Sequence, residues 1–131
     1  MMPIKELRVV LTVHDHEQAV TFYREVLGLP QLADWSGDQG NVVLLDGGHA
    51  TLELVDASQA AFIDQIEVGR RSAGPVRLAI SVEDVDIFAN RGATAGVEPL
   101  GDAVDTPWGD RNIRLSTPDG MQLTLFSSPG E

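Results

Sequence analysis

The start of the chain alternates in hydrophobicity and then changes to a helical period. Residues 5–14 place Leu7, Val9, Leu11 and Val13 on one face, which is typical of a strand with one buried side. Asp15 has the chemistry of a helix N-cap, and Gln18 stands at the capping-box position. Apolar residues then recur at i, i+3, i+4, i+7 and i+8 until Gly28, a residue typical of a helix end. The pattern therefore predicts a strand followed by a helix.

The same order of elements returns in the second half of the chain. A Pro-Asp-Gly turn at 118–120 separates its last two strands. The segment of roughly 56–75 between the halves is compatible with one short helix. In chain order we predict a strand over 5–14, a helix over 15–27, strands over 31–36, 41–46 and 49–55, then a strand over 76–82, a short helix near 85–92, and strands over 97–104, 111–116 and 121–126.

The two halves also match residue by residue. Residues 7–55 and 76–126 read as two copies of one unit, and an offset of 69 pairs the helix caps Asp15 and Asp84. Each half reads as a β-α-β-β-β module, so the fold class is α+β. Two related modules usually meet at an axis, and residues near that axis are candidates for a ligand site. We predict a single domain over 1–131, with module one at about 4–56, a linker at about 57–75 and module two at about 76–127.

Strand phase decides which side chains share the remaining face of each sheet. The helix has to cover the apolar face, so the opposite face lines a cup. Trp108, in the loop before the strand over 111–116, is a candidate aromatic wall for a planar ligand, and a packing plug is the alternative. The strands direct these residues into the cup: Arg8, Thr12, His14, Glu53, Arg77, Ala79, Ser81, Asn112, Arg114, Gln122 and Thr124.

Composition narrows the partners of the predicted cup. The chain has 131 residues, 20 acidic against 9 basic, and a formal net charge of −11. Such a surface repels phosphate backbones and anionic lipid, so neither nucleic acid nor a membrane is an expected partner. There is no cysteine, which excludes disulfides and thiolate chemistry. Neither a signal peptide nor a membrane span is visible in the sequence, so the cytoplasm is the expected compartment.

Three stretches of the sequence resemble a known superfamily. TVHDHEQAVTFYREVLGL is similar to the opening of vicinal oxygen chelate proteins, which include glyoxalase I, ring-cleaving dioxygenases and bleomycin-resistance proteins. EVGRRSAGPVRLAISVEDVD and TPWGDRNIRLSTPDGMQLTLF resemble its second half. The resemblance implies an open, cupped, eight-stranded mixed sheet with the helices outside, and it implies a homodimer. Whether the modules pair within one chain or swap across the dimer stays open.

The resemblance also gives the positions that hold metal in the family's enzymes. They fall on Arg8, Glu53, Arg77 and Thr124, where glyoxalase-like members carry His or Gln, Glu, His and Glu. Arginine stays protonated and offers no lone pair, so neither arginine can bind a divalent cation. One carboxylate and one hydroxyl are a poor cage for zinc, nickel or iron. We therefore predict no metal and no other cofactor.

The charge at these positions leads to a binding hypothesis and its alternative. Arg8, Glu53 and Arg77 sum to +1, and a partly buried net charge favours a counter-ion. The sequence thus predicts a metal-independent protein that binds a small anionic or aromatic molecule, as the resistance proteins sequester a drug without altering it. Alternatively, Arg8, Glu53 and Arg77 form a closed salt-bridge network that holds the modules together. The predicted ligand-binding residues are Arg8, Thr12, His14, Glu53, Arg77, Trp108, Arg114 and Thr124.

An enzyme remains the second functional reading. It would be a glyoxalase-like lyase, isomerase or dioxygenase, with Glu53 as the catalytic base or a residual metal ligand. His14 faces the cup and is a candidate general acid or base, because the unperturbed pKa of histidine lies near neutrality, although a solvated residue at a strand end is the other interpretation. A third possibility is an accessory protein whose cup is filled by its own side chains.

Overall fold

The computed structural model describes residues 8–9, 11, 13–38, 40–50, 53 and 56–128. These residues form a mixed α+β structure with helices and sheets. None of the helices in these ranges is long and apolar enough to cross a bilayer. The elements are α1 (His16–Val20), the π-helix η1 (Thr21–Val26), β1 (Gln31–Asp34), β2 (Val43–Leu45), α2 (Ala57–Glu67), β3 (Leu78–Ser81), α3 (Val85–Thr94), β4 (Glu98–Pro99), β5 (Val104–Asp105), β6 (Arg111–Ser116) and β7 (Gln122–Ser127).

The first helix begins and ends where the sequence predicts. The backbone N–H of Gln18 donates to the Asp15 carboxylate at 3.0 Å, so the predicted cap is confirmed. The side chain of Gln18 does not reach back as in a capping box but donates to the carbonyl of Ala95 at 3.2 Å. Gly28 follows the helix with a φ of 76°, a left-handed conformation that glycine adopts without strain. Neighbouring residues thus determine where the helix begins and ends, and the side chain of Gln18 makes a long-range contact instead of a cap.

Module two forms a five-stranded sheet with the order β3-β7-β6-β4, and β5 also pairs with β6. The β6–β7 hairpin is antiparallel and places Arg114 opposite Thr124. β3 runs parallel to β7 and places Ala79 beside Thr124. The strand predicted over 97–104 is replaced by two short strands, β4 and β5, each of which pairs with β6. The central strands β6 and β7 carry Arg114 and Thr124 of the predicted cup, and Arg77 directly precedes β3.

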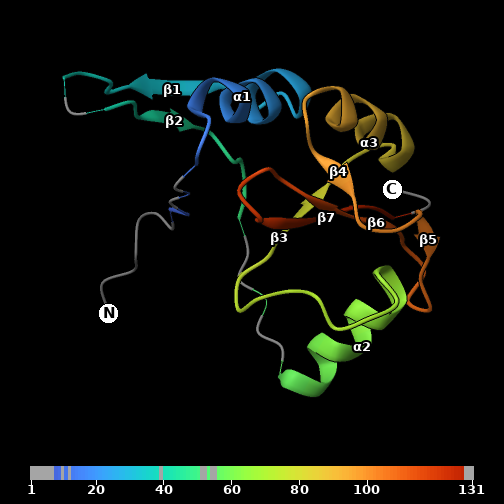
Figure 1. Cartoon of the computed structure of the whole chain (residues 1–131). Helices are drawn as coiled ribbons and strands as arrows, with labels where there is room; N and C mark the ends of the chain where they lie inside the picture. The colour runs from blue at the N-terminus through green and yellow to red at the C-terminus, as the bar shows by residue number, and fades with distance from the viewer. Residues whose placement is uncertain are drawn as a thin grey trace, which may run out of the picture.

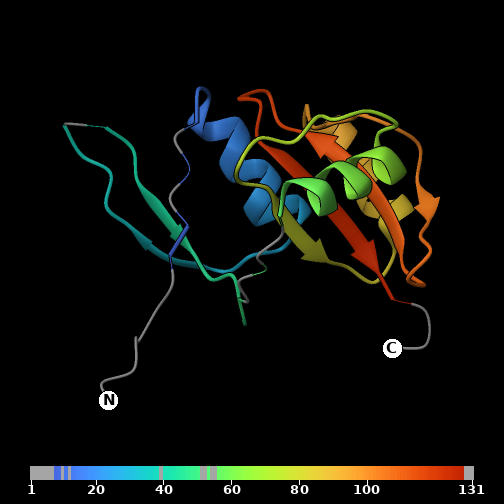
Figure 2. The same ribbon diagram turned by 90° about the horizontal axis from the view of Figure 1, so that it is seen from below.

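Helices cover both faces of this sheet, so module two has three layers (Figures 1 and 2). α3 and η1 lie side by side on the apolar face, above a core in which Phe22 is 1% exposed. Gly92 allows that approach, because a Cβ at this position would lie 3.2 Å from the Phe22 ring. The linker helix α2 covers the opposite face (Figure 2). The buried core residues are Phe22, Val85, Ala89, Val97, Ile113, Leu115, Leu123 and Leu125.

The described residues of module one form one helical segment and one hairpin. β1 and β2 form a separate two-stranded antiparallel sheet, which extends away from the five-stranded sheet (Figure 1). The described residues of the predicted strands over 5–14 and 49–55 are not in strands. The described parts of the chain therefore form sheets of two and five strands.

Candidate functional site

Three of the predicted ligand-binding residues meet on the face of the sheet that α3 does not cover. The hydroxyl of Thr124 accepts a hydrogen bond from Arg77 Nη1 at 2.8 Å and another from Arg114 Nε at 3.2 Å. Thr124 is 2% exposed and Arg114 is fully buried. β3, β6 and β7 are adjacent strands, so their side chains of equal phase point to one side. Strand phase thus predicted this cluster correctly.

The linker helix α2 adds two carboxylates that sequence reasoning missed. Glu67 Oε1 lies 3.0 Å from Arg114 Nε and also accepts a hydrogen bond from the Thr124 hydroxyl at 2.6 Å. Asp64 Oδ1 lies 2.8 Å from Arg114 Nη1. The spacing i, i+3 on the expected linker helix could have revealed that both carboxylates share one helix face. Nothing in the sequence indicated which surface that face would meet.

Asp64 is held in its charged form by several partners. Burial would raise the pKa of its carboxyl, but the backbone N–H groups of Ser72 and Ala73 donate to it at 2.7 and 3.0 Å. The guanidinium groups of Arg114 and Arg71 add their charge. Together these partners outweigh burial and leave the pKa of Asp64 well below its usual range.

Arg77 is the less satisfied cation of the cluster. Its partly buried guanidinium has a lowered pKa, first because of burial and then because of repulsion from Arg114. Glu67, Glu53 and Asp64 oppose that shift through their charges. Among the described residues the hydrogen-bond partner of Arg77 is a neutral hydroxyl, whereas Arg114 has two carboxylates. The Nη2 atom of Arg114 is buried and has no hydrogen-bond partner in the described part of the chain.

The remaining predicted residues that the structure describes are exposed. Arg8 is exposed and lies over the ring of Trp35, with 5.6 Å from Cζ to the ring centroid. Glu53 is exposed and acts on Arg77 by its charge. His14 is exposed, and its backbone N–H donates to the Asp119 carboxylate. Thr12 lies outside the described residues.

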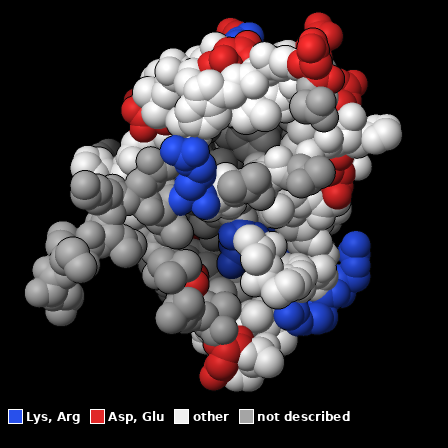
Figure 3. Space-filling model, turned by 90° about the vertical axis from the view of Figure 1, so that its left-hand side faces the viewer, with Lys and Arg blue, Asp and Glu red and all other residues white. Residues whose placement is uncertain are grey.

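Trp108 lies beside a second aromatic ring, that of Phe62 on α2. It is 44% exposed, and its ring centroid is 6.4 Å from that of Phe62 on α2. On the side of the molecule shown in Figure 3, the surface is hollowed and basic side chains lie next to the hollow. The acidic side chains visible in that view lie mostly towards the periphery.

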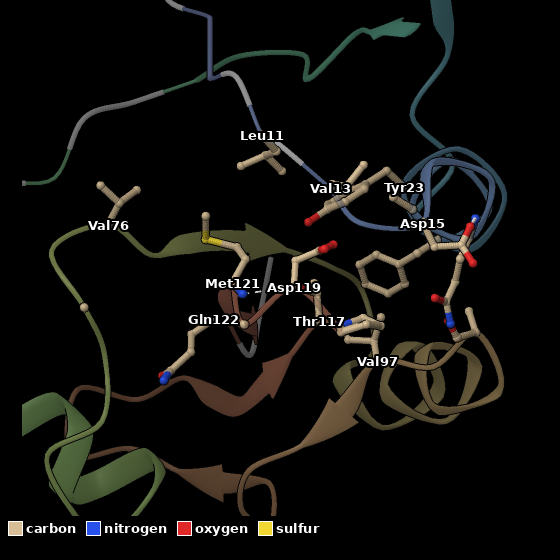
Figure 4. A pocket seen from close by; sticks show the side chains of 17 residues that line it. Leu11, Val13, Asp15, Tyr23, Val76, Val97, Thr117, Asp119, Met121 and Gln122 are labelled. Carbon is tan, nitrogen blue, oxygen red and sulfur yellow. Dashed lines mark hydrogen bonds between the residues drawn. The ribbon is translucent and has the colours of Figure 1, made fainter. Parts of the chain in front are cut away.

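A separate cavity of about 260 Å³ lies between α1, η1 and the turn that joins β6 to β7 (Figure 4). None of the described residues predicted for the site lines it. The cavity borders the cluster, because Gln122 lines it and accepts a hydrogen bond from Arg114 at 2.8 Å, but the other side chains of the two places differ.

Comparison with known proteins gives the family. The model of the Glyoxalase/Bleomycin resistance protein/Dioxygenase superfamily matches residues 7–125. A 2-epi-5-epi-valiolone epimerase from Actinomyces sp. is 37% identical over 145 aligned positions, covering 92% of this chain and 78% of the epimerase.

Solved structures agree with this assignment. TnmS3, an antibiotic binding protein from Streptomyces sp. CB03234, is 29% identical with a TM-score of 0.61, covering 98% of this chain and 99% of that one. A superfamily member from Sphaerobacter thermophilus DSM 20745 is 25% identical with a TM-score of 0.59, covering 95% of this chain and 98% of that one. The chain belongs to the Glyoxalase/Bleomycin resistance protein/Dioxygenase superfamily.

Proposed function

We propose that the protein binds a small organic anion, without chemical change and without a metal, on the face of the sheet formed by β3, β7 and β6. The observation that carries this proposal is the pair of arginines, Arg77 and Arg114, that share the Thr124 hydroxyl on that face. An arginine fork binds a carboxylate through two parallel charge-assisted hydrogen bonds. The similarity to an antibiotic binding protein supports small-molecule binding as the activity.

The charges of the cluster indicate where the anion would bind. Asp64 and Glu67 neutralise Arg114, so this residue does not need a further counter-ion. Arg77 pairs with a neutral hydroxyl, and burial and its neighbour both penalise its charge. A ligand carboxylate at Arg77 would remove that penalty. The exposed Trp108 and Phe62 would offer an aromatic surface beside it.

The proposal includes an eight-stranded cup and a homodimer. Among the described residues the hairpin of β1 and β2 forms a sheet of its own, apart from the five-stranded sheet that carries Arg114 and Thr124 (Figure 1). Module one of a second copy would close the cup and bring Arg8, Thr12, His14 and Glu53 to the site. The measurement is the mass in solution by light scattering, where twice the chain mass of 14.1 kDa is expected. A monomer that still binds the ligand would contradict this part of the proposal.

A second candidate function is isomerisation, favoured by the similarity to an epimerase. Glu53 would be the base. The residues at the family's metal positions do not fit a metal, since Arg77 is a cation bonded to Thr124 and Thr124 is already bonded to Glu67. Within the described residues no group of three or more His, Asp or Glu could hold one. A developing enolate would therefore depend on arginine for stabilisation.

Ligand binding and metal content test the proposal together. With citrate and benzoate as probes, at an ionic strength matched with chloride, we expect the melting temperature to rise in the wild type. Arg77→Met should weaken binding at least about tenfold, because a charge-assisted hydrogen bond is lost. Arg111→Met is the matched control, since it removes an equal charge that pairs with the exposed Asp86 and Asp105.

Two outcomes would overturn the proposal. One is the absence of any anion-dependent shift in the wild type together with a loss of stability in Arg77→Met, which would favour a closed structural network. The other is about one transition-metal ion per chain in the purified protein, which would favour the enzyme.

A further inference from the structure

The cavity between α1, η1 and the β6–β7 turn has a chemistry opposite to that of the arginine cluster. Its wall is mostly apolar, with Leu11, Phe22, Val97 and Met121 among the residues that line it. Asp15 and Asp119 contribute two carboxylates, and no basic side chain is among the described lining residues. The carboxylates would thus repel an anion. They would attract a cation, and the apolar wall would accommodate an apolar body attached to that cation.

Tyr23 adds a polar group that the protein itself does not satisfy. Its hydroxyl is buried and has no hydrogen-bond partner among the described residues. Burial, and then the charge of Asp119, raise the pKa of this phenol to about 12, so it stays protonated at neutral pH. A buried hydroxyl without a partner is costly, and a ligand that hydrogen-bonds to it recovers that cost.

The geometry brings this hydroxyl and a carboxylate to the same space. Figure 4 shows Tyr23 from the helix and Asp119 from the turn both reaching into the cavity, and both line it. The backbone N–H of His14 donates to the Asp119 carboxylate and helps to fix its position. The second oxygen of the carboxylate has lone pairs left for a ligand.

We propose that this cavity is a second small-molecule site, which takes an amine carried on a single ring or a short apolar chain. The ammonium group donates one hydrogen bond to Asp119 and another to the oxygen of Tyr23, since an ammonium has three N–H donors. The apolar body lies against Phe22, Val97 and Met121. The volume of about 260 Å³ suits one ring, because drug-sized pockets begin at about 300 Å³.

Three probes of one shape and different charge test this site. Phenethylamine is the cation, 2-phenylethanol the neutral analogue and phenylacetate the anion. In titrations followed by NMR chemical shifts, phenethylamine is expected to bind at least about tenfold more tightly than phenylacetate. Equal affinity for the two, or no binding of phenethylamine, overturns the proposal.

Variants locate the binding. Asp119→Asn should weaken the binding of phenethylamine at least about tenfold. Tyr23→Phe should weaken the binding severalfold and leave the stability of the protein unchanged, because the Tyr23 hydroxyl has no hydrogen-bond partner among the described residues. Asp102→Asn removes an equal charge from an exposed loop that does not line the cavity and should bind as the wild type does. Unchanged binding in Tyr23→Phe overturns the proposal even if Asp119→Asn fails to fold.

A further variant separates this site from the arginine cluster. Arg77→Met should retain phenethylamine binding, because Arg77 does not line the cavity. A parallel loss of phenethylamine and benzoate binding in this variant would mean that the two sites are one, against the proposal.

Discussion

Arg114 carries its charge inside the protein and is held by two carboxylates of α2. Its side chain is fully buried, and those of Asp64 and Glu67 are 2% and 1% exposed. The removal of one partner from a buried ion pair leaves an uncompensated charge, which costs far more than an exposed pair contributes. The stability of the cluster therefore depends on the complete set of partners.

We expect Asp64→Asn to lower the free energy of unfolding by about 3 kcal/mol or more, because Arg114 and Arg71 both lose a charged partner. Urea denaturation is the measurement. Asp86→Asn is the matched control, since its carboxylate pairs with the exposed Arg111 and should cost less than about 1 kcal/mol.

The pH dependence of stability in acid is a second test of the role of Asp64. A carboxyl whose folded pKa is below its unfolded value stabilises the fold above the unfolded pKa, and that contribution is lost as the pH falls through the folded pKa. The wild type should thus lose stability below about pH 4, and Asp64→Asn should lose less over the same range. Parallel pH profiles of the two proteins would contradict the role assigned to Asp64.

Tyr23 offers a direct titration, because it is the only tyrosine of the chain. We expect the tyrosinate absorbance of the folded protein to appear with a midpoint near pH 12, against about 10 in denaturant. A raised pKa means that the unfolded state loses its proton first, so stability should fall from about pH 10 upwards. Above about pH 10 the wild type should lose about 1–2 kcal/mol of its free energy of unfolding, and Tyr23→Phe should retain it. A midpoint near 10 in the folded protein would show that the phenol is hydrated.

At the scale of elements, α2 is the helix that supplies the carboxylates of the arginine cluster. It lies against β6 opposite α3, and its Phe62 contacts Trp108 in the loop before that strand. Its C-terminal end comes so close to the loop after β4 that a Cβ at Gly101 would lie 2.8 Å from the carbonyl oxygen of Glu67. The position of α2 thus depends on a residue without a side chain.

Gly101→Ala should displace the end of α2 and cost about 1–3 kcal/mol, as overpacking does elsewhere. In a Trp35→Phe background the emission of Trp108 reports the contact with Phe62 and should shift in this variant. Gly47→Ala is the control, because a Cβ there meets nothing within 4 Å. An unchanged emission and stability in Gly101→Ala would mean that α2 does not depend on this close approach.

Elements whose signals are local were predictable from the sequence. Asp15 and Asp84 both cap helices at equivalent positions of the repeat. The turn at 118–120 joins β6 to β7, and Gly120 has the φ of 83° that such a turn requires. The strand predicted over 97–104 was not observed as one element, because its two ends pair with different parts of β6.

At the scale of the whole molecule, the described parts of the two modules have different surroundings. Module two is a sheet with a helix on each face, whereas the β1–β2 hairpin of module one extends from the body (Figures 1 and 2). The helix of module one packs on the core of module two through Phe22. The two modules thus share one core without forming one sheet among the described residues.

The sequence by itself determined the superfamily, the caps and turns, and the strand phase that brings Arg77, Arg114 and Thr124 together. These features follow from neighbouring residues, whose spacing determines the backbone conformation and the face of the strand or helix on which each side chain lies. Only the tertiary structure decided that Asp64 and Glu67 cover those arginines, and that Tyr23 and Asp119 share a cavity. Such contacts join segments far apart in the chain, and hydrophobic periodicity says that a face is buried without saying against what.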